Sequence, residues 1–201
     1  MSKIPVTRIH APLAQERSIR EAVRRTHETP DGARLARLDD TDALLALLSD
    51  PTVSDPIYTL PRPINRKTVK DFISRHLDER ARGEGLLLVG LDGAEAAATY
   101  HDIQFWPQWS ACELGGAIRA DKQNAGAGVA GAAAAFGWLF EGIGVDLICE
   151  TAALDNFRTK RLLERLGFSY AGEIESELPG GGTRASLCWE MTKADWRSQN
   201  I

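Results

Sequence analysis

Apolar residues recur along the chain at two spacings, every third or fourth residue in some segments and every second residue in others. The first spacing is typical of helices packed against a core, and the second of half-buried strands. Clusters of glycine, proline and aspartate separate these segments, as expected for turns. The predicted order is strand, helix, helix, three strands, helix, strand, helix and two strands, over about residues 33–38, 43–48, 69–77, 86–91, 94–103, 112–119, 127–141, 145–151, 156–166, 169–177 and 185–192. This α/β order predicts a mixed sheet with helices on both faces.

Residues 1–30 differ from the rest of the chain. They are rich in charged residues, weakly periodic, and end in the turn signal Thr29-Pro30-Asp31-Gly32. We expect a partly helical N-terminal extension, which is either a dimer arm of a homodimer or, more simply, a solvated segment. One domain is then expected over residues 31–195.

The composition excludes several classes of protein. A chain of 201 residues with 43% hydrophobic and 26% charged residues is sufficient for one globular domain. A formal net charge of -4 provides no basic surface, so nucleic acid is not an expected partner. The apolar runs are too short to span a membrane, and we expect a cytoplasmic protein. The spacing of cysteines and histidines predicts no metal site.

The segment 118–129 contains the strongest candidate for a binding site. A predicted strand ends there, Gly126 and Gly128 flank one small residue, and an amphipathic helix begins. Glycines allow close approach of the backbone to a ligand, and the free N–H groups of a helix's first turn favour phosphate. A tight turn without a ligand is an equally good explanation of the two glycines. The chain has neither the GxxxxGK[ST] nor the GxGxxG pattern of nucleotide-binding loops.

The pattern Gln123-x-x-Gly126-x-Gly128, with Ile118 five residues before the glutamine, resembles the acetyl-CoA signature of the GNAT acetyltransferases, Q/R-x-x-G-x-G/A. The resemblance covers about residues 33–192 and implies the GNAT fold, whose sheet of about seven strands is mostly antiparallel. It implies acetyl-CoA as the cofactor, the Ile118 N–H as a donor to the thioester carbonyl, and backbone contacts of Ala117 and Arg119 with pantetheine. The residues implied to hold the pyrophosphate are Gln123, Asn124, Ala125, Gly126, Ala127, Gly128 and Val129.

The segment 155–168 is predicted to be a helix with an Asp/Asn cap at its start and a glycine at its end. A helix that only packs on the core would have the same features. The segment also resembles the family's N-x-x-(A/S) stretch, which follows the strand after the pyrophosphate helix. That resemblance implies that Asn156 binds pantetheine or a water, and that Lys160 or Arg161 contacts the cofactor's phosphates. The details are most similar to the RimJ/RimL-type branch.

Acetyl transfer requires a base that accepts a proton from the substrate ammonium group. Glu113, in the central strand, is the first candidate and Glu150, near the end of the next strand, is the second; either could instead be a solvent-facing strand residue. Many family members have a tyrosine acid where this chain has Leu163. Thr159 is a candidate for bonding the sulfur, although its hydroxyl could also bond back to its own helix.

Phe105, Trp106 and Trp109 lie in a predicted loop before the central strand, where acceptor pockets lie in this fold. Aromatic rings there would suit an organic cation or a peptide amino terminus, but packing of the loop explains them equally well. The resemblance therefore implies an acetyl-CoA-dependent N-acetyltransferase acting on a primary amine, of a protein, a peptide or a small molecule. The alternative is a non-catalytic acetyl-CoA sensor, which the missing tyrosine favours.

Overall fold

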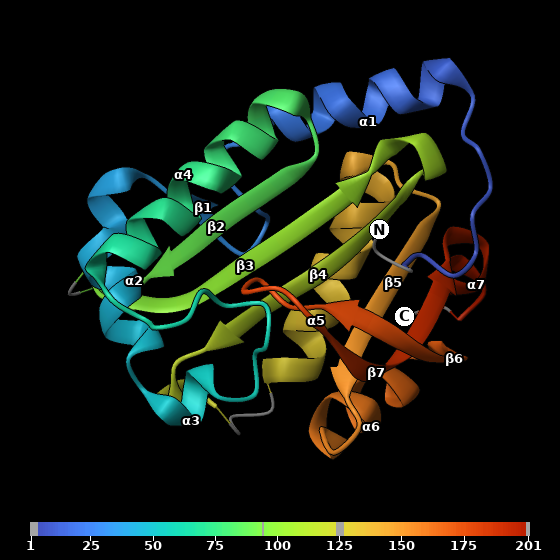
Figure 1. The fold of residues 1–201 in the computed structure, drawn as a ribbon. Helices are drawn as coiled ribbons and strands as arrows, with labels where there is room; N and C mark the ends of the chain where they lie inside the picture. The colour runs from blue at the N-terminus through green and yellow to red at the C-terminus, as the bar shows by residue number, and fades with distance from the viewer. Residues whose placement is uncertain (1–3, 94, 124–126, 200–201) are drawn as a thin grey trace.

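The structure is a computed structural model that describes residues 4–93, 95–123 and 127–199. Seven strands form one sheet in the order β1-β2-β3-β4-β5-β7-β6 (Figure 1). Every neighbouring pair is antiparallel except β4 and β5, which are parallel. The strands are β1 (Arg34–Leu35), β2 (Gly85–Leu91), β3 (Ala97–Trp106), β4 (Ala111–Ile118), β5 (Leu147–Ala153), β6 (Ser169–Glu177) and β7 (Thr183–Thr192). The predicted mixed, mostly antiparallel sheet is confirmed.

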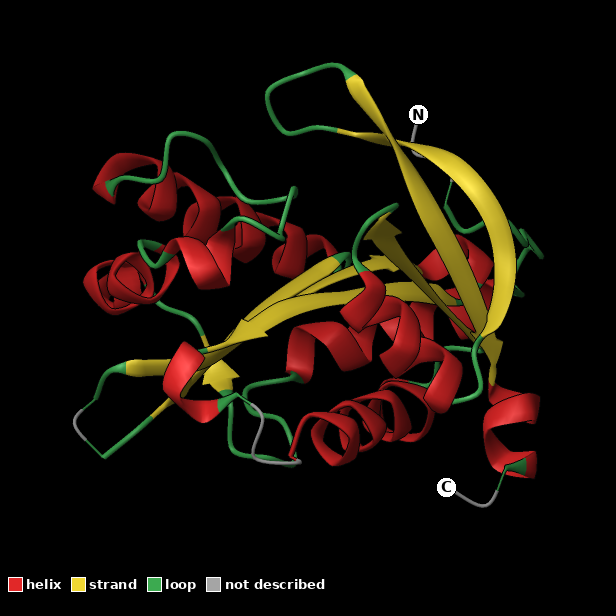
Figure 2. Cartoon of the chain, turned by 90° about the horizontal axis from the view of Figure 1, so that it is seen from below, coloured by secondary structure: helices red, strands yellow, loops and turns green. Residues whose placement is uncertain are grey.

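Helices cover both faces of the sheet, as Figure 2 shows from below. The α-helices are α1 (Leu13–Arg25), α2 (Thr41–Leu48), α3 (Pro51–Ser54), α4 (Arg66–Arg82), α5 (Ala127–Trp138), α6 (Phe157–Arg165) and α7 (Lys193–Ser198). Alternate residues of β2 point to opposite faces, so Leu87 and Val89 pack with α2 and α4. Leu86 and Leu88 pack in the other core, with α1 and α5.

Helix α1 belongs to the main core, although it lies within the predicted N-terminal extension. Its Ile19 and Val23 are one turn apart and fully buried. On the neighbouring side of the helix, Arg20 forms an ion pair with Glu84 at 2.8 Å. The prediction of a solvated segment is therefore wrong for α1. Its apolar stripe is narrow, and the many arginines around it obscured the helical period.

Two further elements differ from the prediction. Strand β3 continues to Trp106, so Phe105 and Trp106 are paired strand residues rather than parts of a loop. The expected loop over 51–63 contains the short helix α3, with Pro51 at its first position and Asp50 as its cap. Proline is favoured at the start of a helix because its missing N–H would have no partner there.

The parallel pair β4–β5 is only partly closed. Its backbone register covers Ala111↔Leu147 and Cys112↔Ile148, although both strands continue well beyond these residues. The remaining residues, 113–118 and 149–153, diverge toward the carboxyl ends of the strands (Figure 1). This leaves a gap inside the sheet, with α5 on one face of it. We refer to it below as the β4–β5 gap.

Gly116 lies at the open part of β4 and has a backbone conformation that requires glycine. Its φ is +149°, and a Cβ on this residue would lie 2.3 Å from the Tyr100 carbonyl oxygen on β3. A side chain would therefore both strain the backbone and push β3 and β4 apart.

We predict that Gly116→Ala lowers the free energy of unfolding by about 1–3 kcal/mol, because it adds strain at a positive φ. The matched control is Gly131→Ala in α5, where a new Cβ meets no atom within 4 Å and alanine favours the helix by about 0.5–1 kcal/mol. Thermal melts of both variants test this. Equal melting temperatures for Gly116→Ala and wild type would contradict it.

Candidate functional site

Backbone groups on one edge of β4 face the β4–β5 gap. The Leu114 N–H donates to Glu150 Oε1 at 3.0 Å, and the Ile118 carbonyl accepts from Gln123 Nε2 at 2.7 Å. The Arg119 N–H points the other way and donates to Ala98 on β3 at 2.8 Å. Because backbone groups alternate along a strand, Gly116 also faces the gap, whereas Ala117 faces β3. This geometry favours Ile118 over Ala117 and Arg119 as a backbone partner of the cofactor, and the contacts of all three residues stay predictions.

The two candidate bases lie at the gap on opposite faces of the sheet. Cys112 and Ile148 pack together in the core beside α5, so Glu113, the next residue of β4, points to the opposite face. Glu150 is two residues after Ile148 and therefore lies on the same face as α5. The structure thus brings both glutamates to one gap but assigns them different surroundings.

Glu113 is held by a chain of hydroxyl groups. The Thr151 hydroxyl on β5 donates to Glu113 Oε1 at 2.5 Å, and the Tyr58 hydroxyl lies 2.7 Å from the same Thr151 oxygen. Burial raises the pKa of Glu113 to about 7; the Thr151 hydroxyl opposes this rise, and the negative charge of Asp102 adds to it. A carboxyl with this pKa is ionised in about half of the molecules at neutral pH.

Glu150 is more deeply buried than Glu113. Burial, and then the charge of Glu113, raise its pKa well above the usual value, and the bond from the Leu114 N–H only partly opposes them. A raised pKa favours the neutral, protonated form of this carboxyl. The surroundings of Glu150 are therefore unsuited to the role of a base that the sequence suggested as the second candidate.

A buried histidine–aspartate pair lies beside Glu113. His76 of α4 is buried, and its Nε2 lies 2.8 Å from Asp102 Oδ1 on β3, while its Nδ1 lies 2.9 Å from the Phe72 carbonyl. Both neighbours are acceptors, so a protonated imidazole satisfies both contacts. Burial lowers the pKa of His76, but the Asp102 carboxylate outweighs this and brings it above the ordinary value of 6.5.

The predicted pyrophosphate turn connects β4 to α5. Asn124, Ala125 and Gly126 lie outside the described residues, and α5 begins directly after them at Ala127. Gly128 lies in the first turn of this helix, and Val129 packs against the main core. The strand–turn–helix order predicted for this segment is confirmed, while binding at the turn stays a prediction.

Helix α6 follows β5 and packs, through Leu163, on the same core as α5. Asn156 caps it, because its Oδ1 accepts from the Thr159 N–H at 3.1 Å. Arg158 Nη1 donates to Gln123 Oε1 at 2.8 Å, which connects α6 to the predicted pyrophosphate turn. Arg161 is three residues further along and shares that side of the helix. Lys160 instead lies 3.9 Å from Glu164, so α6 presents Arg158 to the turn, a residue that the sequence interpretation missed.

The predicted acceptor aromatics lie at the closed end of the gap. Phe105 pairs with Cys112, is fully buried in the main core and cannot contact an acceptor there. Trp106 packs beside Ile4, Cys149 and Cys188, and Trp109 lies under the Arg8 guanidinium at 4.5 Å. The prediction that all three residues lie in a loop is therefore wrong, and a contact of Trp106 or Trp109 with an acceptor stays a prediction. They were misplaced because proline at 107 suggested an earlier end to β3.

Tyr58 and Thr151 had no local signal in the sequence. Tyr58 comes from the proline-rich segment after α3, which has no helical or strand period. Thr151 follows Glu150 in β5 and resembles an ordinary strand residue. Leu163, which stands where many family members have a tyrosine, is buried in the core.

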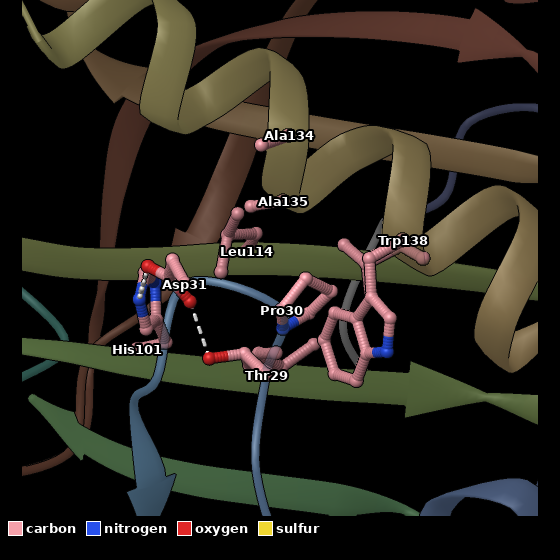
Figure 3. A pocket seen from close by; sticks show the side chains of 10 residues that line it. Thr29, Pro30, Asp31, His101, Leu114, Ala134, Ala135 and Trp138 are labelled. Carbon is pink, nitrogen blue, oxygen red and sulfur yellow. Dashed lines mark hydrogen bonds and ion pairs between the residues drawn. The ribbon is translucent and has the colours of Figure 1, made fainter.

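A small pocket lies on the α5 face of the sheet, away from Glu113. Its walls are apolar residues of α5 and β4, among them Leu114, Ala135 and Trp138, and the turn after α1 closes it (Figure 3). His101 Nε2 lies 3.5 Å from Asp31 Oδ2 at its edge. Burial lowers the pKa of His101, although Asp31 opposes this. The contact between His101 and Asp31 connects the turn to β3. The pocket itself lies where α5 packs on the sheet.

Within residues 4–93, 95–123 and 127–199, no group of histidine, cysteine, aspartate and glutamate side chains could hold a metal ion. A search of the same residues found no helix that is both long and apolar enough to cross a membrane.

Comparison with known proteins identifies the family of this chain. The sequence profile of the family described as "Acetyltransferase (GNAT) domain" matches residues 33–169, more than half of the chain. The chain therefore belongs to the GNAT acetyltransferase family and is an N-acetyltransferase; proteins of this family use acetyl-CoA. No curated protein matches the sequence.

Several solved structures share the fold. The ribosomal-protein-S5-alanine acetyltransferase from Vibrio fischeri is 15% identical, with a TM-score of 0.66 over 82% of this chain and 93% of that one. RimJ from Mycobacterium smegmatis, in complex with CoA-disulfide, is 18% identical, with a TM-score of 0.66 over 82% of both chains. The spermidine/spermine N-acetyltransferase SpeG from Vibrio cholerae is 13% identical, with a TM-score of 0.65 over 84% of this chain and 97% of that one. The resemblance to the RimJ/RimL branch is consistent with these neighbours.

We predict that His76→Gln destabilises the protein more at low pH than at high pH. The folded-state pKa of His76 is raised, so the ion pair with Asp102 is fully present below about pH 6.5 and is lost as the pH rises through the folded-state value. The stability gap to wild type should be about 1.5–3 kcal/mol at low pH. Urea titrations at pH 5.5 and pH 9 test this, and a gap that grows with pH would contradict it.

Proposed function

We propose that this chain transfers the acetyl group of acetyl-CoA to a primary amine, with Glu113 as the general base. The observation that carries the proposal is a carboxyl group with a pKa of about 7 at the β4–β5 gap, on the face opposite α5. A general base works best when its pKa lies near the working pH, because it is then both ionised and able to hold a proton.

The position of the cofactor follows from the same gap. The first turn of α5 offers free N–H groups that suit the pyrophosphate, and Arg158 is the nearest basic side chain of α6. From there, the backbone edge with Gly116 and Ile118 can bind the pantetheine arm as an added strand would. The thioester then lies between β4 and β5, with the Ile118 N–H as a donor to its carbonyl oxygen.

The acceptor approaches from the face that carries Glu113. There, the Glu113 carboxylate takes a proton from the ammonium group, directly or through one water. The free amine attacks the thioester carbon, and the carbon–sulfur bond breaks. The nitrogen then releases its second proton to water, and the departing thiolate takes up one proton to leave as the thiol. The raised pKa of Glu150 favours its protonated form, so Glu150 is better suited to give the thiolate that proton than to act as a base.

Two structural neighbours suggest which acceptors to test. One acts, by its name, on an alanine of ribosomal protein S5 and another on spermidine and spermine. Both kinds of acceptor carry a primary amine. A panel of peptides with free amino termini and of polyamines therefore covers the two classes.

We predict that the protein releases free thiol from acetyl-CoA when one of these amines is present. Wild-type kcat/KM should rise with pH around the Glu113 pKa of about 7. Glu113→Gln should lose activity by about 10²–10⁴-fold, because a general base contributes about this much. It should also lose the rise near pH 7, keeping only the pH dependence of the amine itself.

The matched control is Glu173→Gln, on an exposed position of β6. It should leave the rate and the pH profile unchanged. Tight acetyl-CoA binding without thiol release on any amine would instead support the non-catalytic sensor, and an active Glu113→Gln enzyme would remove Glu113 from the role of base.

We predict that Arg158→Ala raises the KM for acetyl-CoA several-fold and leaves kcat nearly unchanged, because it removes a contact made equally in the ground and transition states. Lys160→Ala removes a charge of the same sign from the other side of α6 and is the control. Steady-state kinetics at varied acetyl-CoA test this. Equal effects of the two substitutions would contradict the placement of the phosphates beside Arg158.

A further inference from the structure

A hydrogen-bonded chain connects Glu113 to a loop that the family resemblance does not include in the site. The loop, residues 55–65, joins α3 to α4 and carries Tyr58. Tyr58 reaches across to Thr151 of β5 at 2.7 Å, and Thr151 reaches Glu113 of β4 at 2.5 Å. Three segments that are far apart in the sequence thus meet through two short contacts.

When Glu113 is ionised, the chemistry of these groups fixes the direction of both hydrogen bonds. An ionised carboxylate only accepts hydrogen bonds, and a threonine hydroxyl has a single proton to donate. The Thr151 proton therefore goes to Glu113, and Thr151 must accept from Tyr58. Burial, and then the charge of Glu113, raise the pKa of Tyr58, so its hydroxyl keeps the proton that this arrangement needs.

The Tyr58 ring is held independently of these bonds. The Arg184 guanidinium of β7 lies 4.3 Å from the ring centroid, which is within the range of a cation–π contact. The ring is therefore fixed between the loop and the β6–β7 hairpin. A fixed Tyr58 in turn limits the rotation of the Thr151 hydroxyl and keeps its proton on Glu113.

The effect on Glu113 has a definite sign. A donor to a carboxylate favours the charged form, while burial and the Asp102 carboxylate both favour the neutral form. Without the Thr151 donor, Glu113 would be mostly protonated at neutral pH and unable to accept a proton from the substrate.

We propose that Tyr58 and Thr151 are positioning residues that keep Glu113 ionised and oriented toward the β4–β5 gap. The proposal rests on the proposed function only in taking Glu113 as the base. Neither residue needs to touch the acceptor or the cofactor for this role.

The test measures the titration of Glu113 itself, without turnover. Protein labelled with ¹³C at the glutamate carboxyl carbons is titrated by NMR, and Glu113→Gln identifies the resonance. In Thr151→Val the titration should move to higher pH, with roughly a tenfold smaller ionised fraction at pH 7, as expected for the loss of one hydrogen bond to a charged group. Tyr58→Phe should move it in the same direction by less, and Thr151→Ser should restore the wild-type titration.

Two controls have the same chemistry at sites away from the chain of hydroxyls. Thr183→Val and Tyr170→Phe change exposed residues of β7 and β6 and should leave the titration unchanged. In kinetics, the acid limb of the kcat/KM profile should move to higher pH in Thr151→Val, while the rate at high pH stays near wild type. Loss of activity at all pH values, without a shift of the acid limb, would indicate that Thr151 has a merely structural role.

The outcomes separate this proposal from the proposed function. An unchanged Glu113 titration in Thr151→Val and Tyr58→Phe would overturn it, even if Glu113→Gln is inactive. If the titration moves as expected but Glu113→Gln still acetylates amines, the positioning is supported and the assignment of Glu113 as the base fails. If Thr151→Val does not fold, Thr151→Ala and Thr151→Ser provide the same comparison.

Discussion

The parallel pairing of β4 with β5 ends after Cys112 and Ile148, and the site depends on this early end. Backbone groups in a sheet interior need partners, so the divergence leaves donors and acceptors of β4 that the sheet itself does not satisfy. Side chains satisfy two of these backbone groups: Glu150 accepts from the Leu114 N–H, and Gln123 donates to the Ile118 carbonyl. The exposed edge around Gly116 remains suitable for a ligand that binds like a strand.

The same divergence explains how two glutamates acquire different proton affinities. Each projects from a strand that borders the gap, but the alternation of strand residues places them on opposite faces. Glu113 receives a hydroxyl donor and has a pKa of about 7, whereas Glu150 is buried beside α5 and has a pKa well above its usual value. Pairs of titratable groups whose surroundings separate their pKa values are typical of sites that both accept and donate protons.

Much of the fold could be predicted from the sequence because its signals are local. The helical period of α4 and the Asn156 cap of α6 each depend on neighbouring residues, and each agrees with the structure. The errors arose where a local signal was weak or misleading. Helix α1 presents only a narrow apolar stripe, and Pro107 concealed the last three residues of β3.

The sequence by itself determined the family, the strand–turn–helix order around Gln123 and the shortlist of Glu113 and Glu150. Only the tertiary structure distinguishes the surroundings of the two glutamates, because their proton affinities depend on burial and on partners far away in the chain. Thr151 is 38 residues from Glu113 and 93 from Tyr58. No pattern of spacing encodes such contacts, since they depend on how the loop 55–65 lies over β5. For the same physical reason, Arg158 rather than Lys160 became the basic residue beside the predicted pyrophosphate turn.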